Sequence, residues 1–200
     1  MGMWTRKATA TGGDFEKAPP GNHPAVLVAI IDLGTQENEY QGVKRYEERA
    51  YFCWELVNEK NTAGKNHLIG IDLTVSMNEK AKLRQWVEAW RGRKLAEGEE
   101  FDIRKLLGQK CLLSVTEKNG YSKVAGVAAV PKGMGVAGSE RTPVLWSIET
   151  DEGKTPVPEW LPWLYGSKLS DVVATRFVKT DETGNGKAAQ QEAVESEIPF

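Results

Sequence analysis

The stretch Arg45–Val57, RYEERAYFCWELV, decides the fold class of this chain. In its second half, bulky residues alternate between two sets, with Tyr51 and Cys53 in one set and Phe52 and Trp54 in the other. A run of aromatic and apolar residues with a period of two predicts a β-strand. Because both sets are largely apolar, at least one of them must face a hydrophobic core.

Two more strands flank this one. Ala25–Thr35 (AVLVAIIDLGT) is an apolar run that ends near Gly34, which is typical of a strand buried on much of both faces. His67–Ser76 (HLIGIDLTVS) alternates again and follows a polar turn region over Asn58–Asn66. The first half of the chain therefore predicts three consecutive strands.

A helix follows the third strand. In Asn78–Trp90 (NEKAKLRQWVEAW) the apolar residues recur at a spacing of three to four, Ser76 or Asn78 can cap the N-terminus, and Gly92 can end the helix. A short helical turn is expected over Phe101–Leu107.

A hairpin is predicted next. Lys110–Glu117 and Tyr121–Val130 have strand composition and flank Asn119-Gly120, a dipeptide that strongly favours two-residue hairpin turns. A short strand over Pro143–Glu149 and a short helix over Ser167–Phe177 are further expectations.

Three strands, a helix and a strand pair are the order of an oligonucleotide/oligosaccharide-binding (OB) fold, a five-stranded Greek-key barrel with its helix between strands 3 and 4. We therefore expect a mainly β chain in four parts. These are a flexible N-terminal arm (1–24), an OB-fold domain that binds single strands (25–150), a Pro/Trp-rich extension that packs on the barrel (151–178) and a disordered acidic tail with a partner-binding tip (179–200).

The formal net charge of −2 is unevenly distributed, because residues from Lys179 onward contribute −3 and the preceding residues +1. A near-neutral body with an acidic tail allows a basic surface in a protein of low pI. No run approaches the roughly 20 apolar residues of a membrane span, and the N-terminus lacks the apolar centre of a signal peptide. The expected location is the cytoplasm of a bacterial cell.

Few residues suit catalysis or metal binding. Cys53 and Cys111 are far apart in apolar sequence, and His23 and His67 have no metal-ligand spacing with them, so two buried free thiols are expected. The Gly-rich loop Pro131–Gly138 does not continue into a helix, and the chain has no phosphate-binding loop followed by Lys-Ser/Thr. We predict no catalytic residue, metal or cofactor, and therefore no enzyme.

The chain ends in an acidic segment with an apolar tip. From Ala188 onward it holds three glutamates and no lysine or arginine, and it closes on Glu-Ser-Glu-Ile-Pro-Phe. This resembles the C-terminal tip of bacterial single-stranded DNA-binding proteins, an acidic run that closes on Ile-Pro-Phe. In such a tip the terminal ring fills an apolar pocket and a basic residue binds the terminal carboxylate. The predicted partner-binding residues are Glu195, Glu197, Ile198, Pro199 and Phe200.

A second resemblance lies in Ser76–Arg93, where Trp86, Trp90 and the WRGR run are similar to proteins from bacteriophage replication modules. Together the two resemblances imply a phage-encoded protein that carries the host's tip. The implied function is sequence-independent binding and protection of single-stranded DNA during replication, recombination and repair. The tip would recruit host or phage enzymes.

Proteins bind single strands through aromatic rings that stack on bases and basic side chains that contact phosphates. In the OB fold, the binding surface commonly includes the loop between the first two strands and the faces of strands 2 and 3, and we expect the loop between strands 4 and 5 to wall the groove. The predicted DNA-binding residues are Tyr40, Lys44, Arg45, Tyr46, Arg49 and Trp54 in the first region, Lys118, Tyr121 and Lys123 in the second, and Lys132 in the Gly-rich loop.

Three alternatives stay open. An adaptor or decoy that binds no DNA would use the tip to occupy the tip-binding pockets of host replication and repair enzymes. A mediator would bind DNA only while it loads a recombinase. Trp160 and Trp163, among prolines, fit either packing over the barrel or a self-association surface, and so leave a homo-oligomer open.

Overall fold

The computed structural model describes residues 16–178, which form a six-stranded sheet with a few short helices. The strands are β1 (Gly21–Tyr40), β2 (Val43–Lys60), β3 (Asn66–Thr74), β4 (Lys110–Lys118), β5 (Tyr121–Ala128) and β6 (Val144–Trp146). The helices are α1 (Lys82–Arg91), the 3₁₀ helix η1 (Ile103–Leu106), α2 (Ile148–Asp151) and α3 (Leu169–Ala174). The prediction of a mainly β chain is therefore confirmed.

The strands follow the order β3-β2-β1-β4-β5, and all neighbours in this order are antiparallel. The short β6 pairs with β1 in parallel. Within residues 16–178, β3 and β5 form no strand pair, so the sheet is not closed. Helix α1 follows β3 and precedes β4, as the sequence predicted.

The first two strands are longer than expected because they continue as a hairpin. They pair as far as Tyr40↔Val43, whereas β3 pairs with β2 only up to Thr74↔Arg49. We call residues 35–48 the hairpin arm. Gln41 and Gly42 form its turn with φ values of 52° and 78°, the two positive angles that a type I′ turn requires. Residues 36–44 (QENEYQGVK) are mostly polar, so no apolar alternation predicted that the two strands continue to this turn.

Strand β1 also begins earlier than the apolar run that predicted it. Gly21 pairs with Val115 of β4, so residues 21–24, which we expected in the N-terminal arm, belong to the strand. The backbone N–H and C=O groups of residues 21–24 find hydrogen-bond partners in β4, and the pattern of side chains does not reveal such pairing. This pairing places the start of β1 beside the β4–β5 hairpin.

Residues 16–19 lie along the gap between β3 and β5. The ring Nδ1 of His67, at the start of β3, donates to the Glu16 carbonyl at 3.3 Å. The hydroxyl of Ser122, at the start of β5, donates to the Ala18 carbonyl at 2.5 Å. The methyl group of Ala18 is buried in the core. This segment thus connects the two strands that do not pair with each other.

One face of the sheet packs on α1. Phe52, Trp54 and Leu56 of β2 join Trp86 of this helix in one core cluster. The helix starts at Lys82, later than predicted, and it ends at Gly92, which has the expected left-handed φ of 67°. Before it, the Asn78 side chain accepts from the Lys80 amide at 3.1 Å, and this local turn delays the helix.

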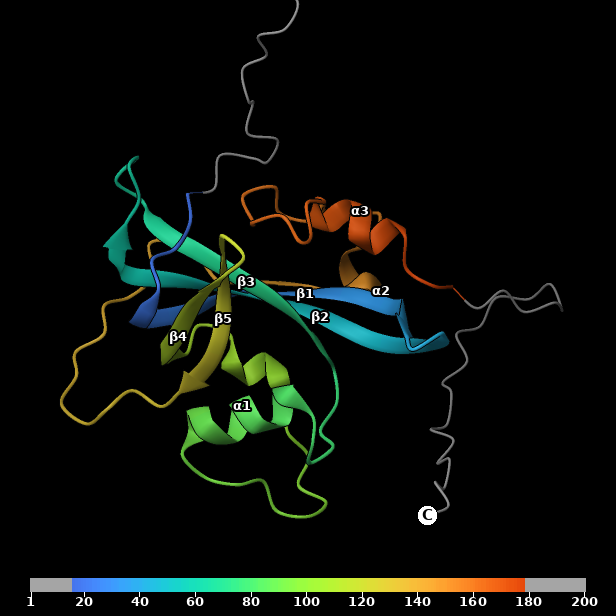
Figure 1. Cartoon of the computed structure of the whole chain (residues 1–200), viewed down its shortest axis with the longest axis horizontal. Coiled ribbons are helices and arrows are strands. Elements are labelled where there is room, and N and C mark those ends of the chain that lie inside the picture. The colour runs from blue at the N-terminus through green and yellow to red at the C-terminus, as the bar shows by residue number, and fades with distance from the viewer. Residues whose placement is uncertain (1–15, 179–200) are drawn as a thin grey trace, which may run out of the picture.

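The opposite face is covered by the C-terminal part of the chain. Tyr51 and Cys53 of β2 share a second core cluster with Leu161, Leu169 and Val173. Figure 1 shows α1 and α3 on opposite sides of β1 and β2. Because both faces are covered there, both alternating sets of β2 side chains are buried from Ala50 to Val57.

Candidate nucleic-acid interface

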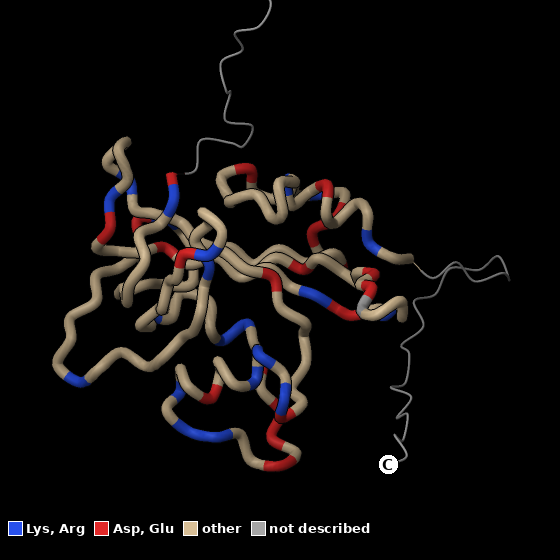
Figure 2. Tube along the Cα trace, in the orientation of Figure 1, with Lys and Arg blue, Asp and Glu red and all other residues tan. Residues whose placement is uncertain are grey.

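The hairpin arm presents basic and aromatic side chains to solvent. Lys44, Arg45 and Tyr46 are exposed on its second strand. Figure 2 shows that acidic and basic residues alternate along this part of the chain. The Lys44 ammonium lies 2.7 Å from the Glu37 carboxylate, and the Tyr46 hydroxyl donates to the same carboxylate at 3.1 Å. The hydrogen bond with Lys44 lowers the pKa of Glu37 and raises the pKa of Lys44.

A second aromatic ring joins the arm from the far end of the described chain. The Phe177 ring lies 4.3 Å from the Tyr46 ring between centroids, and the Phe177 amide donates to the Thr35 carbonyl at 2.8 Å. Both rings remain partly exposed. Sequence reasoning missed Phe177 because no local pattern links it to β2. Tyr40 lies in β1 opposite Val43, at the tip of the arm.

Arg49, at the base of the arm, is held by carboxylates. Its Nε donates to Asp72 at 2.8 Å, and its Nη1 lies 3.4 Å from Glu47. Asp72 also accepts from the Tyr165 hydroxyl at 2.7 Å. The charge of Arg49 is therefore largely compensated within the protein. Lys44 and Arg45 are the exposed cations of the arm itself, and Lys44 is paired with Glu37.

Trp54 does not belong to a DNA-binding surface, contrary to the sequence prediction. Its side chain is 1% exposed, and its ring lies 6.2 Å from Trp86 and 6.4 Å from Trp90 between centroids. The alternation of β2 directs it into the core beneath α1. No face of the ring is available for stacking on a base.

The other predicted cluster lies on the β4–β5 hairpin. Lys118, Tyr121 and Lys123 are exposed there, and Asn119 and Gly120 form the predicted turn with φ values of 54° and 77°. Lys17, which sequence reasoning missed, lies with its Nζ 6.0 Å from the centre of the Tyr121 ring.

The two clusters lie at opposite ends of β1. Strand β4 pairs with Gly21–Val26, whereas the hairpin arm contains the last residues of β1. The structure therefore does not join them into one groove across the sheet. Lys132 belongs to neither cluster and is exposed on the loop between β5 and β6.

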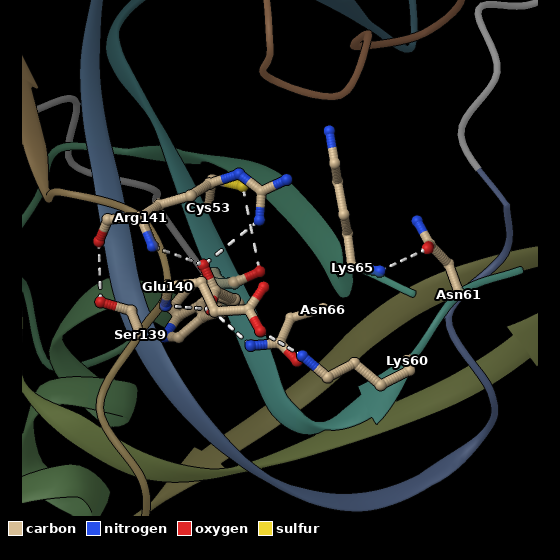
Figure 3. A network of polar contacts seen from close by, with 10 residues as sticks. Cys53, Lys60, Asn61, Lys65, Asn66, Ser139, Glu140 and Arg141 are labelled. Carbon is tan, nitrogen blue, oxygen red and sulfur yellow. Dashed lines mark hydrogen bonds and ion pairs between the residues drawn. The ribbon is translucent and has the colours of Figure 1, made fainter. Parts of the chain in front are cut away.

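The outer face of β2 and β3, which we expected to contribute to DNA binding, is covered. The fully buried Glu55 carboxylate accepts from the Asn66 side chain and the Glu140 amide, both at 2.7 Å, and from the Arg141 guanidinium at 3.3 Å. Figure 3 shows Asn66, Glu140 and Arg141 converging in this network. The Tyr51 hydroxyl donates to the Pro162 carbonyl at 3.2 Å. Segment 139–162 thus occupies the surface.

Nothing in residues 16–178 resembles a metal centre, since these residues contain no group of three His, Cys, Asp or Glu that could hold an ion. Cys53 and Cys111 are buried free thiols, and burial raises the pKa of both. No helix in this part of the chain is long and apolar enough to cross a membrane.

No match to a protein-family model, a curated protein or a solved structure is found for this chain. The predicted partner-binding residues Glu195, Glu197, Ile198, Pro199 and Phe200 lie outside the described residues, as do residues 1–15 of the expected N-terminal arm.

Proposed function

We propose that this protein binds and protects single-stranded DNA without reading its sequence, and that its C-terminal tip recruits replication, recombination and repair enzymes. The proposed setting is the cytoplasm of a bacterial cell, with the gene carried by a bacteriophage. The observation that carries the proposal is the hairpin arm, where Lys44 and Arg45 are exposed in the same strand as Tyr46, whose ring lies 4.3 Å from the Phe177 ring at an angle of 40°. Aromatic platforms beside cations are the usual means of binding single strands.

We further propose that the sheet is an OB-fold barrel. The order β3-β2-β1-β4-β5 with α1 between β3 and β4 supports this interpretation, because an OB barrel has this connectivity. In such a barrel the gap between β3 and β5 would be the closing seam. The hydrogen bonds of residues 16–19 to His67 and Ser122 lie across that gap.

The proposed DNA path runs along the hairpin arm. It does not cross the outer face of β2 and β3, which is covered. The arm projects beyond β3, so a strand can contact its exposed residues without displacing segment 139–162. The β4–β5 hairpin, with Lys118, Tyr121 and Lys123, is a second contact region for a strand long enough to reach it.

The test of DNA binding is fluorescence anisotropy with a labelled oligothymidine of about 30 nucleotides and a matched duplex, at low and moderate salt. We expect binding to the single strand that weakens as salt rises, and little binding to the duplex. Replacing both Lys44 and Arg45 with alanine should reduce the affinity and its salt dependence. Lys65→Ala, in the exposed β2–β3 turn, is the control that should not change either.

Deleting Glu195–Phe200 should leave the DNA affinity unchanged or slightly tighter and abolish capture of enzymes that bind the host's tip. A large loss of DNA affinity in this deletion would contradict the proposal that the body binds DNA and the tip only recruits enzymes.

An adaptor or decoy that binds no DNA is the second candidate. The covered outer face of β2 and β3 favours it, because the proposed fold commonly binds its ligands there. It predicts no anisotropy change with either DNA and full capture of tip-binding enzymes by the unmodified chain.

A further inference from the structure

A pocket of about 320 Å³ lies between the base of the hairpin arm and the C-terminal part of the chain. Its lining residues are Leu33, Gln36, Glu37, Asn38, Arg49 and Asp72 from the sheet, and Leu164, Tyr165 and Val172 from the C-terminal segment. The Gln36 amide donates to the Leu33 carbonyl at 2.6 Å and to the Val172 carbonyl at 3.2 Å, which fixes one wall to the other. The pocket is thus formed by docking of the C-terminal segment on the sheet.

Tyr165 lines this pocket from a two-residue turn. Tyr165 and Gly166 connect Leu164 and Ser167, which exchange two backbone hydrogen bonds, and they have the positive φ values, 52° and 82°, of a type I′ turn. At this turn Tyr165 is 83% exposed. Its hydroxyl nevertheless donates to the buried Asp72 at 2.7 Å. Partial burial of the phenol and this hydrogen bond raise the pKa of Tyr165 to about 12. The result is an anchored ring that is open to solvent.

The electrostatics of the pocket favour a neutral occupant over a phosphate. Asp72 compensates Arg49, and the Glu37 carboxylate also lines the pocket, so a phosphate would meet negative charge there. Leu33, Leu164 and Val172 provide apolar contact. The Asn38 amide can bond to a polar edge, whereas the Gln36 amide has only its oxygen left for a ligand, because its NH₂ group already donates to two carbonyls. A volume at the small end of ligand pockets suits one flat polar ring system.

We propose that this pocket holds one nucleobase of a bound single strand, stacked on the Tyr165 ring. The phosphates on either side of that base then lie toward Lys44 and Arg45 on the arm. This inference rests on the proposed function and adds to it a base-binding position built by the C-terminal segment.

Photocrosslinking tests the inference directly. An oligothymidine of about 30 nucleotides, with 5-iododeoxyuridine in place of some thymidines, is irradiated with the full chain, and the modified residue is identified by mass spectrometry. We expect the crosslink at Tyr165. Tyr165→Ala should lose this crosslink and bind the oligonucleotide about tenfold more weakly, in line with removal of one stacked base. Tyr165→Phe should keep the crosslink and bind within about twofold of the original chain.

A second variant separates the pocket from the tyrosine itself. Val172→Phe is designed to fill the pocket from α3 while Tyr165 stays in place, and it should weaken binding about as much as Tyr165→Ala. Leu145→Ala removes an exposed apolar side chain from β6, outside the pocket lining, and should change nothing. Urea unfolding of each variant verifies that it is folded.

The outcomes distinguish this inference from the proposed function. If the original chain binds the single strand, crosslinks only at other residues and is unaffected by Tyr165→Ala and Val172→Phe, the base pocket is refuted and DNA binding stands. If free 5-iododeoxyuridine monophosphate crosslinks to Tyr165 as efficiently as the oligonucleotide, the ligand is a free nucleotide and the strand-bound base is refuted. If no DNA binds, both proposals fail.

Discussion

Glu55 is a fully buried acidic residue that connects β2 to segment 139–162. Its carboxylate is inaccessible to solvent and accepts hydrogen bonds from Asn66, Glu140 and Arg141 (Figure 3). Three of its four hydrogen bonds come from backbone or side-chain amide N–H groups. Hydrogen bonding, rather than the single ion pair with Arg141, therefore offsets most of the cost of burying this carboxylate. Such a group stabilises the fold only while its partners remain.

Glu55→Gln should therefore lower the free energy of unfolding by about 2–4 kcal/mol. The NH₂ group of the glutamine would face the N–H donors of Asn66, Glu140 and Arg141, and the Arg141 guanidinium would lose its buried carboxylate. Urea denaturation measures the change. Glu140→Gln is the matched control in the same network, because the Lys60–Glu140 pair is exposed. The unfolding midpoint of Glu140→Gln should not change. Equal effects of the two substitutions would contradict the stabilising role of the buried Glu55 carboxylate.

At the scale of elements, β3 packs beneath Tyr51 because it has a glycine at position 70. A Cβ on Gly70 would overlap the hydroxyl and the ring of Tyr51, whose side chain is buried between the sheet and the C-terminal segment. The Tyr51 hydroxyl donates to the Pro162 carbonyl, so the ring cannot move without breaking that bond. A single methyl group at position 70 would thus disturb both the pairing of β2 with β3 and the packing of the C-terminal segment on Tyr51.

Gly70→Ala should destabilise the chain by about 2–3 kcal/mol through overpacking. Gly126→Ala in β5 is the control, since a Cβ there meets no atom within 4 Å and its φ lies outside the left-handed region. Thermal unfolding followed by circular dichroism compares the two. A Gly70→Ala chain as stable as the Gly126→Ala chain would show that Tyr51 is free to move.

At the scale of the whole molecule, the C-terminal segment completes a second core. Leu161, Leu164, Leu169 and Val173 cover apolar residues of β1 and β2 that would otherwise face water. The same segment contributes Tyr165 to the pocket and Phe177 to the arm. Stability and the proposed binding surface therefore depend on the same docking.

A chain that ends at residue 150 should consequently fail to fold cooperatively, because part of the second face would be exposed. A chain that ends at residue 178 should unfold as the full chain does. Circular dichroism, urea unfolding and binding of an apolar dye measure the difference. Cooperative unfolding of the shorter chain at the full-length midpoint would mean that residues 151–178 contribute nothing to the core.

Sequence alone determined the local elements of this protein. The alternation in Arg45–Val57 and His67–Ser76, the Asn119-Gly120 turn and the stop at Gly92 all predicted structure that is observed. They succeeded because side-chain period and turn conformation are properties of neighbouring residues. The exposed positions of Lys44, Arg45 and Tyr46 were not determined in this way, since they depend on how far the hairpin extends beyond β3.

Only the tertiary structure decided which surfaces remain open. It buried Trp54, compensated Arg49 with Asp72, and covered the face of β2 and β3 on which a single strand was expected. It also placed Tyr165 and Phe177 beside the hairpin arm, far from it in sequence. The physical reason is that burial and charge compensation arise from contacts between distant segments, and such contacts leave no periodic trace in the sequence of either segment.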